Sequence, residues 1–474
     1  MSKKYMKDIV NIFIFRRDFR IVDNTALTLL KKSYPEYDIL PVFIFNPKQI
    51  DKSVNPYYSV PSVEFMIESL SNLNSYLDSK LCYLYGEDIE VLSKLLKNVS
   101  INCIAFNTDF TPFAKKRDES VRQWCDSNKI PVITYNDYVL YDFKIKTDSG
   151  KDYEVYTPFY RKCIANLKLV PHPTKDTKDI RAKIYTAKIQ GSIKNIGKFI
   201  DGITPQRDLK GGRDEAFHII SKIRSGFFAK YDKERDYPSM NKTTKLSPYL
   251  KFGCVSIREV FWECINAYGP SHGLVRELIW REFYANVTNN IPHVLEGQIR
   301  NKGLNYPMKL KYKDIEWPQN DINFKKWCDG KTGFPFVDAA MICMNKTGYM
   351  HNRLRMIVAM FLTKDMMIDW RLGEKYFATK LVDYDPASNS GGWQWAGSIG
   401  ADSQPYFRIF NPWTQSIKFD KDCVFIKKWI PILINVPNKS IHQWYKDHKL
   451  FNIGYPEPIL DHAVESKKSI SYFT

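Results

Sequence analysis

The chain has 474 residues, 44% of them hydrophobic and 15% aromatic, and its 70 Lys and Arg residues exceed the 52 Asp and Glu residues to give a net charge of +18. This length predicts at least two domains, and the absence of an apolar run of about 18 residues excludes a membrane-spanning helix. The positive charge favours a polyanionic partner such as nucleic acid, although a lysine-rich coding bias would give the same excess.

Short apolar runs alternate with segments of helical spacing over the first 136 residues. The segments 63–77 and 88–98 carry helical spacing between these runs. Strands that alternate with helices form a parallel sheet covered by helices, so residues 1–136 predict a Rossmann-like α/β domain. The runs expected to be buried strands are 9–15, 39–45, 80–86, 101–107 and 130–136.

Strand signals fade after this domain. Residues 137–205 are basic and interrupted by Pro and Gly, which indicates an interdomain linker. Residues 206–474 carry helical periodicity and are predicted to form a second, all-helical domain. Its expected helical stretches include 247–269, 274–290, 336–348 and 347–371.

Several common fingerprints are absent from the sequence. No GxGxxG follows the first strand, and GKT at 330–332 lacks the upstream glycine of a phosphate-binding loop. The nine cysteines are scattered, so we expect buried thiols and neither disulfides nor a metal site. No signal peptide is recognisable, which predicts a soluble intracellular protein.

A charged segment, FIFRRDFRIVDNTAL (13–27), continues directly out of the first strand. A loop at the C-terminal edge of a parallel sheet is where such folds bind ligands. The alternative, which general grounds favour, is a solvated turn held by salt bridges. The charged residues concerned are Arg16, Arg17, Asp18, Arg20 and Asp23.

Two segments of the helical part combine polar groups with helical spacing. In KTTKLSPYLKFGCVS, the hydroxyls of Thr243, Thr244 and Ser247 would cap a helix and offer its N–H groups to an anion, or serve as plain caps. In ELIWREFYANV, Glu277 and Trp280 share a helix face that suits a flat polar heterocycle, although a core Trp beside a surface Glu is more common.

The helix predicted over 347–371 presents a mixed face of Asn352, Arg355, Met356 and Ala359. Asn and Arg are rare in a core stripe. This face therefore predicts the wall of a pocket or, equally, the polar edge of an amphipathic helix.

The segment DYDPASNSGGWQW (383–395) combines acids, adjacent glycines and two tryptophans. Gly391 and Gly392 allow the backbone to bend or a flat group to approach it closely. Trp393 and Trp395 would share a face on a strand and diverge on a helix.

Taken together and in order, these blocks resemble one protein family. FRRDFR, TTKLSPYL, ELIWREFY, KTGFPFVDAAM, TGYMHNRLRM, DYDPASNSGGWQW and QPYFRIFNP are similar to the photolyase/cryptochrome family, and most to its class I cyclobutane pyrimidine dimer photolyases. The resemblance implies an α/β antenna domain, a linker and a helical domain that holds FAD. It assigns to FAD Tyr231, Thr243, Thr244, Leu246, Ser247, Arg355, Asp383, Asp385 and Asn389.

The resemblance also implies a substrate, which is UV-damaged DNA with a flipped-out pyrimidine dimer bound by a monomeric enzyme. Light would excite FADH⁻, an electron would pass to the dimer, two C–C bonds would split, and the electron would return. An electron chain would run through Trp393, Trp370 and Trp317. The residues assigned to the lesion and DNA are Arg235, Glu277, Trp280, Asn352, Arg353, Met356, Trp395 and Arg408.

Two other activities within the family remain open. The (6-4) photolyases carry two histidines in place of Asn352 and Met356, whereas His351 here is one residue away. Plant cryptochromes, which are photoreceptors, carry Asp in place of Asn389. A nucleic-acid-binding protein without catalysis would explain the charge but neither Asn389 nor the three tryptophans.

The resemblance leaves the antenna chromophore open. Folate-binding members use a Cys-Lys pair where this chain has Leu295-Glu296, which argues against folate. Asn107 and Asp109 end a predicted strand where an antenna ligand would bind, although turn capping is their simpler role. A deazaflavin, another second chromophore or none is compatible with the sequence.

Overall fold

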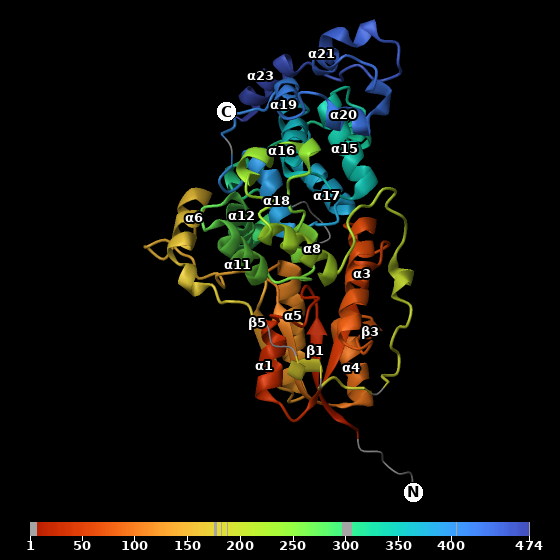
Figure 1. The fold of residues 1–474 in the computed structure, drawn as a ribbon, viewed down its shortest axis with the longest axis vertical. Helices are drawn as coiled ribbons and strands as arrows, with labels where there is room; N and C mark the ends of the chain where they lie inside the picture. Colours follow the sequence, from red (N-terminus) through yellow and green to blue (C-terminus); the bar gives the residue numbers. More distant parts are fainter. Residues whose placement is uncertain are drawn as a thin grey trace.

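The computed structural model describes residues 7–174, 178–181, 183–186, 188–295, 306–403 and 405–473. A parallel sheet with its helices forms one end of the molecule, and a helical body forms the other (Figure 1). The predicted α/β and all-helical parts are therefore confirmed. The strands are β1 (Ile9–Phe15), β2 (Asp38–Phe45), β3 (Cys82–Tyr85), β4 (Ser100–Thr108) and β5 (Val132–Asn136).

The five strands lie in the order β3-β2-β1-β4-β5, and every pair is parallel. The chain leaves β1 first toward one edge of the sheet and later, from β3, crosses back to β4 on the other side. This reversal creates a crevice outside the carboxyl ends of β1 and β4, where open parallel sheets bind ligands. The helices that connect the strands are α1 (Thr25–Ser33), α2 (Pro47–Ile50), α3 (Val60–Tyr76), α4 (Asp88–Asn98) and α5 (Pro112–Ser127).

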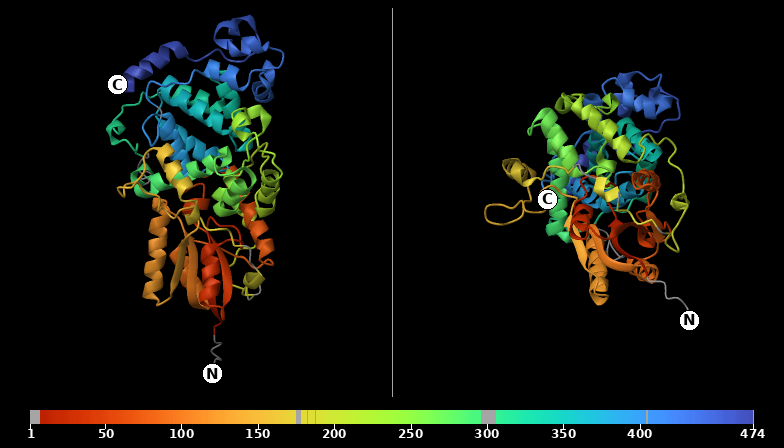
Figure 2. Two further views of the ribbon diagram at one scale, coloured as in Figure 1. Left: turned by 60° about the vertical axis from the view of Figure 1, so that its left-hand side comes forward. Right: turned by 60° about the horizontal axis from the view of Figure 1, so that its bottom comes forward.

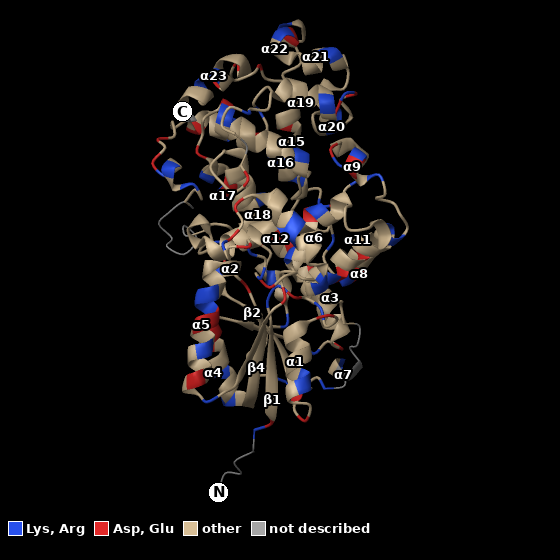
Figure 3. Ribbon diagram, turned by 90° about the vertical axis from the view of Figure 1, so that its left-hand side faces the viewer, with Lys and Arg blue, Asp and Glu red and all other residues tan. Residues whose placement is uncertain are grey.

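Alternation along the strands gives the sheet two different faces. On β1, Val10, Ile12 and Ile14 point toward α4 and α5, whereas Phe13 and Phe15 point toward α1 and α3. The strands carry almost no charge, which gathers on the surrounding helices (Figure 3). The aromatic face belongs to a core that continues into the helical body, through side chains of α8 (Arg213–Arg224), α11 (Ile257–Tyr268) and α12 (Gly273–Asn290).

A second core lies within the helical body, above the sheet in both views of Figure 2. Trp327, Trp370 and Trp444 are among its fully buried side chains. In the part of the body that the structure describes, the remaining α-helices are α9 (Tyr231–Glu234), α10 (Ser247–Lys251), α14 (Asp321–Asp329), α15 (Pro335–Thr347), α16 (Asn352–Met360), α17 (Trp370–Lys380), α18 (Pro386–Ala396), α19 (Pro412–Phe419), α20 (Val424–Trp429), α21 (Asn438–His442), α22 (Trp444–Asp447) and α23 (His462–Phe473).

The chain between the two parts begins in the interior of the molecule. Tyr138 and Val139 are buried, and the N–H groups of Leu140 and Tyr141 donate to the buried carboxylate of Glu282 on α12 at 2.8 and 3.0 Å. Further along are α6 (Tyr156–Ala165) and α7 (Lys178–Arg181). The domain boundaries given above stay predictions.

Two of the expected helical stretches are broken. The stretch 247–269 divides into α10 and α11 because Gly253 adopts a φ of +64° and Ser256 starts α11 with a capping box. The stretch 347–371 begins only at Asn352, since His351 caps α16, and it ends in a π-helical turn over Phe361–Asp365. Continuous apolar spacing does not reveal these interruptions.

Candidate functional site

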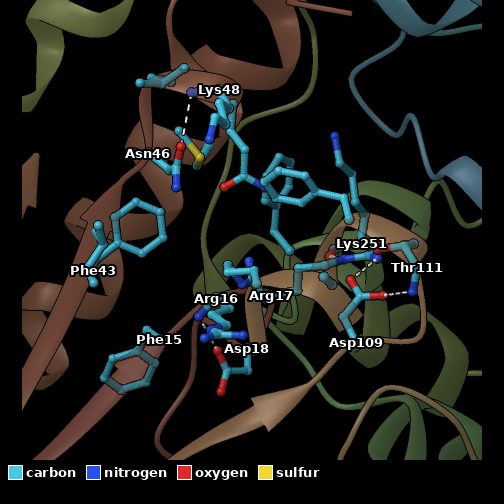
Figure 4. Close-up of a pocket in the computed structure, with 18 of the residues that line it drawn as sticks. Phe15, Arg16, Arg17, Asp18, Phe43, Asn46, Lys48, Asp109, Thr111 and Lys251 are labelled. Atoms are coloured by element: carbon cyan, nitrogen blue, oxygen red, sulfur yellow. Dashed lines mark hydrogen bonds and ion pairs between the residues drawn. The ribbon is translucent and has the colours of Figure 1, made fainter. Parts of the chain in front are cut away.

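A cavity of about 340 Å³ opens at the crevice between β1 and β4. The residues that follow these strands line it, and Lys251 of α10 reaches it from the helical body (Figure 4). Phe15 and Phe43 give it an apolar wall, whereas Arg16, Arg17 and Lys251 bring positive charge. This is the place and the mixture of groups expected for a ligand site.

The solvated turn expected for FRRDFR is wrong. Asp18 and Arg20 are each only 2% exposed, and Arg16 forms an ion pair with Asp118 of α5. The carboxylate of Asp18 accepts hydrogen bonds from the N–H of Arg16 at 2.7 Å and from Asn107 at 2.6 Å. The helical body covers this edge of the sheet, so these charges lose their water and must pair with one another.

Of the two residues suggested for the antenna site, Asp109 caps a turn, whereas a contact of either residue with an antenna ligand stays a prediction. Asn107 holds the loop through Asp18 and the backbone of Ala26, and Asp109 accepts the Thr111 N–H at 2.9 Å as a turn cap. Both also line the cavity. Burial alone would raise the pKa of Asp109, but Arg17, the Thr111 N–H and Arg117 together outweigh burial, and the pKa is lowered.

Lys251 lies at the boundary between this cavity and the helical body. Its Nζ donates to Ser62 Oγ at 2.5 Å and to the carbonyl of Val382 at 3.5 Å. Burial, together with the nearby Arg17, lowers its pKa to about 7. The parallel rings of Tyr57 and Tyr384, 6.2 Å apart, also line the cavity, so it suits a flat ligand.

A second cluster joins three segments of the helical body around Asp383. Its carboxylate accepts hydrogen bonds from Ser247 Oγ at 2.6 Å and from Arg355 Nη2 at 2.8 and 3.0 Å. Asp383 is 6% exposed. The cluster thus brings α10 and α16 to the segment that precedes α18.

The hydroxyls expected to cap the helix at 247 do not do so. Leu246 occupies the N-cap position of α10 and provides no side-chain cap. The Ser247 hydroxyl donates to Asp383 instead, because a carboxylate is the stronger acceptor. Thr244 Oγ1 accepts the Leu246 N–H at 3.4 Å. Thr243 is half-buried, and Tyr231 is buried.

The segment 383–395 is a helix from Pro386, so its two tryptophans diverge. Trp393 is buried with its ring edge-on to Phe377 at 5.0 Å, whereas Trp395 is half-buried. The close approach expected at Gly391 is to the Tyr284 ring of α12, not to a ligand. A Cβ at Gly392 would meet nothing within 4 Å.

Asn389 lies on α18, one turn before Trp393. Its Nδ2 donates to Glu374 Oε1 at 2.9 Å and to the Glu374 carbonyl at 3.0 Å. Glu374 is 2% exposed, and burial raises its pKa to about 7. A proton on this carboxyl group is therefore exchangeable near neutral pH.

Two ion pairs border the face assigned to the lesion. Arg235 pairs with Glu277 of α12, and Arg353 Nη2 donates to Asp236 at 2.9 Å. Burial raises the pKa of Glu277 despite the opposing charge of Arg235. Both arginines therefore reach this face already paired with carboxylates.

The remaining residues assigned to the substrate are partly accessible. Trp280 stacks on Tyr156 at 3.7 Å with an angle of 6°, so one of its faces is covered. Asn352 is exposed at the first turn of α16, Met356 is half-buried one turn later, and Arg408 is exposed. Because α12 and α16 both pack against α18, Trp280, Asn352 and Met356 belong to one helical assembly.

The three tryptophans assigned to an electron chain occupy different depths. Trp393 and Trp370 are each 2% exposed, and Trp317 is half-buried with its ring 6.4 Å from that of Tyr472. Trp393 also contacts the buried Trp327 at 6.1 Å. A route for electrons through the three tryptophans stays a prediction.

Sequence reasoning missed three residues of these clusters, Tyr138, Lys251 and Glu374, and it missed the contact of Arg17 with Asp385. Their partners are distant in sequence, so no spacing pattern links them. The position of Arg17 at the ligand-binding edge of the sheet was the one available signal. Glu296 of the Leu295-Glu296 pair lies outside the described residues.

The residues around α18 fit a flavin dinucleotide. The helix is surrounded by hydroxyl groups, an Arg–Asp ion pair and an amide. On this helix Gly392 faces open space, and Trp393 Nε1 has no hydrogen-bond partner in the described part of the chain. Among the described residues, no group of three His, Cys, Asp or Glu side chains suits a metal ion. No helix in the described ranges is long and apolar enough to cross a membrane.

Known proteins resemble the chain over nearly its whole length. Residues 11–178 match the model described as DNA photolyase, and residues 274–474 match the FAD binding domain of DNA photolyase. A deoxyribodipyrimidine photo-lyase of Alkalihalophilus pseudofirmus is 34% identical over 97% of this chain and 96% of that protein.

Two solved structures share the fold and substantial sequence. An archaeal photolyase from Sulfolobus tokodaii, solved with two FAD molecules, is 36% identical with a TM-score of 0.83 over 98% of this chain and 99% of that one. A class III photolyase from Agrobacterium tumefaciens is 28% identical with a TM-score of 0.86 over 100% of this chain and 98% of that one.

Proposed function

The chain belongs to the photolyase/cryptochrome family, and on this premise we propose that the helical body holds FAD at α18 beneath a bound pyrimidine dimer. The protein is a light-driven DNA-repair enzyme that splits cyclobutane pyrimidine dimers, a carbon–carbon lyase. Its DNA substrate agrees with the net charge of +18.

The proposed positions of the flavin and of the pyrimidine dimer rest on one observation, the ion pair between Arg355 and Asp383. Asn352 lies one turn before both Arg355 and Met356 on α16, at i,i+3 and i,i+4, so its side chain neighbours both of theirs. The pair therefore ties the proposed lesion contacts to the proposed flavin contacts through a single helix.

FAD, when bound in its reduced form, supplies the photoexcited electron that opens the cyclobutane ring. We assign Thr243, Thr244 and Ser247 to its phosphates and ribityl chain, with Tyr231 and Leu246 beside them. The Arg355–Asp383 pair and Asp385 orient the flavin ring and ribose. Asn389 is assigned to the edge of the flavin ring. Glu374 holds the Asn389 amide in place and carries an exchangeable proton.

The lesion is held by groups on α12, α16 and α18. Trp280 and Trp395 provide aromatic surfaces for a flipped-out dimer, which costs least to extrude at a distorted site. Glu277 donates a hydrogen bond to a thymine carbonyl oxygen when it is protonated, and its raised pKa favours that form. Asn352 and Met356 contact the two bases, and Arg235, Arg353 and Arg408 face the DNA backbone.

The cavity at the sheet edge is proposed to hold a second, light-harvesting chromophore. Its position, its parallel tyrosines and its cations suit a flat ligand with negative charge. The structure of the Sulfolobus tokodaii photolyase contains two FAD molecules and is described as implying a novel light-harvesting cofactor. The identity of the chromophore in this chain stays open.

A repair assay tests the function directly. Reduced holoprotein would be illuminated with blue or near-UV light on an oligonucleotide with one thymine dimer, with darkness and a (6-4) oligonucleotide as controls. We expect light-dependent loss of the cyclobutane dimer alone. Repair of only the (6-4) lesion would contradict the roles of Asn352 and Met356, and no repair by flavin-loaded protein would favour a cryptochrome-like photoreceptor.

Finer assignments remain proposals. We likewise propose membership of class I, action as a monomer and location inside the cell; the relatives include a class III enzyme. A monomer is expected in light scattering of the holoprotein with and without DNA.

A further inference from the structure

Arg17 lies in the loop after β1, yet it reaches a carboxylate 368 positions along the chain. Its Nη2 donates to Asp385 Oδ2 at 2.6 Å and to the Tyr138 hydroxyl at 2.7 Å. The other end of the same guanidinium donates to Asp109 Oδ2 at 2.9 Å. One side chain therefore connects the sheet-edge cavity with the N-terminus of α18.

The helical body fixes the position of this arginine. Arg17 Nε donates to the carbonyl of Lys251 at 3.1 Å, at the end of α10. Gly253 packs so tightly against the Arg17 backbone that a Cβ would overlap the Arg17 carbonyl. The Phe19 N–H donates to the Phe252 carbonyl at 3.0 Å, which holds the loop and the end of α10 together.

Asp385, the partner of Arg17, lies at the start of a helix. Asp385 is the N-cap of α18 and accepts the Ser388 N–H at 3.0 Å. The Tyr138 hydroxyl donates to the same carboxylate at 2.6 Å. Asp385 is 7% exposed, so its charge depends on these partners and not on water.

We propose that Arg17 is a positioning residue of the flavin site, which reaches across from the sheet edge and fixes the Asp385 carboxylate at the start of α18. This inference rests on the proposed role of Asp385 in binding FAD. It means that the flavin site is completed by the α/β part of the chain, and that the sheet-edge cavity and the flavin site share one guanidinium.

The charge of Asp385 gives the proposal a pH signature. Arg17, Tyr138, Arg281 and Lys251 face this carboxylate. Burial would raise its pKa, but Arg17 first, then the Tyr138 hydroxyl and the Ser388 N–H, hold the pKa well below its usual range. Removal of Arg17 would therefore raise the pKa of Asp385, so the carboxyl group would take up a proton at a higher pH than in the unaltered protein and would bind FAD less tightly.

The experiment measures release of FAD from holoprotein, by the fluorescence of free FAD on dilution, at pH 7.5 and 5.5. Arg17→Met should raise the Kd for FAD about tenfold at pH 7.5, because a charged hydrogen bond is lost, and further at pH 5.5. Arg17→Lys keeps the charge and should recover most of the affinity at pH 7.5. The unaltered protein should show little change between the two pH values.

Arg207→Met is the matched control. Arg207 also joins the two parts of the chain, through Glu68 and Glu64 of α3, and its side chain is 19% exposed against 21% for Arg17. This change should lower the Tm without altering the Kd for FAD at either pH.

Two results would overturn the role of Arg17. The first is an Arg17→Met protein whose Kd for FAD stays within about twofold of the unaltered protein at both pH values. The second is an equal rise in Kd for Arg17→Met and Arg207→Met, which would indicate a general loss of contact between the two parts. Unaltered protein that binds no FAD would instead overturn the proposed function and this inference with it.

Discussion

The carboxyl group of Glu277 is subject to opposing influences on its protonation. Burial raises its pKa and the nearby Arg235 opposes that rise. As the pH increases through the raised pKa, the carboxyl loses the proton that it would donate to the dimer. We therefore expect the repair yield per absorbed photon to fall as the pH rises through this raised pKa, measured on a thymine-dimer oligonucleotide across the pH range in which the protein stays folded.

Variants of Glu277 separate this effect from others. Glu277→Gln keeps a hydrogen-bond donor at every pH and should remove the pH dependence. Glu277→Ala should lower the yield about tenfold at the acidic end of this range, since a hydrogen bond to a charged group is lost. An unchanged pH dependence in Glu277→Gln would show that another group titrates.

At the scale of single residues, the sequence predicts membership of a site better than contacts within it. Arg355 and Asp383 were assigned together only through family resemblance, and they do form an ion pair. The partners of Ser247 and Asn389 were not foreseen, because each lies on another element far along the chain. Such contacts depend on how elements pack, which periodicity does not encode.

The contact between α12 and α18 gives a prediction at the scale of elements. A Cβ at Gly391 would overlap the Tyr284 ring, so Gly391→Ala should push the two helices apart and lower the unfolding free energy by about 1–3 kcal/mol. Gly392 lies on the same helix with nothing within 4 Å of its Cβ position.

The matched comparison is made by thermal unfolding of the protein without flavin. Gly392→Ala should leave the Tm unchanged or raise it, because alanine favours a helix over glycine by roughly 1 kcal/mol. Equal Tm values for the two variants would contradict the packing role of Gly391.

Elements themselves were predictable where one physical signal dominated. Each of the five apolar runs became a strand, because β-branched and aromatic residues in short runs suit a buried parallel sheet. Helix ends were less predictable: Gly253 and His351 interrupt stretches whose apolar spacing continues. At Gly253 the backbone also lies against the Arg17 carbonyl, a tertiary contact that apolar spacing does not show.

At the scale of the whole molecule, the sheet and the helical body share one core and one buried charge network. Arg258 of α11, 4% exposed, donates to Asp23 Oδ2 at 2.9 Å and to Asp137 Oδ1 at 2.6 Å, and Asp137 also pairs with Arg20. Arg258→Met would leave these carboxylates buried and short of a partner. It should lower the unfolding free energy by about 3–5 kcal/mol.

The shared core predicts that both parts unfold together. Calorimetry should show a single transition, which Arg258→Met shifts as a whole. The exposed pair of Arg224 and Glu263 provides the control, and Arg224→Met should change stability by less than about 1 kcal/mol. A separate early transition of the sheet in Arg258→Met would contradict this view.

The cavity at the sheet edge provides the last prediction, because a second chromophore there would serve the flavin from a distance. Met66 lines the cavity from α3 and is only partly buried, so Met66→Trp should fill the cavity while the adjoining core stays packed. The ratio of bound chromophore to protein, after incubation with excess FAD, FMN or a deazaflavin, should fall by about one equivalent.

Repair under light absorbed by the flavin itself should persist in Met66→Trp, whereas the action spectrum should lose the contribution of the second chromophore. Met66→Leu conserves volume and should retain both. A full second equivalent in Met66→Trp would place the antenna elsewhere, since a tryptophan ring and a flat chromophore cannot share a space of about 340 Å³ without displacing the walls that hold Arg17.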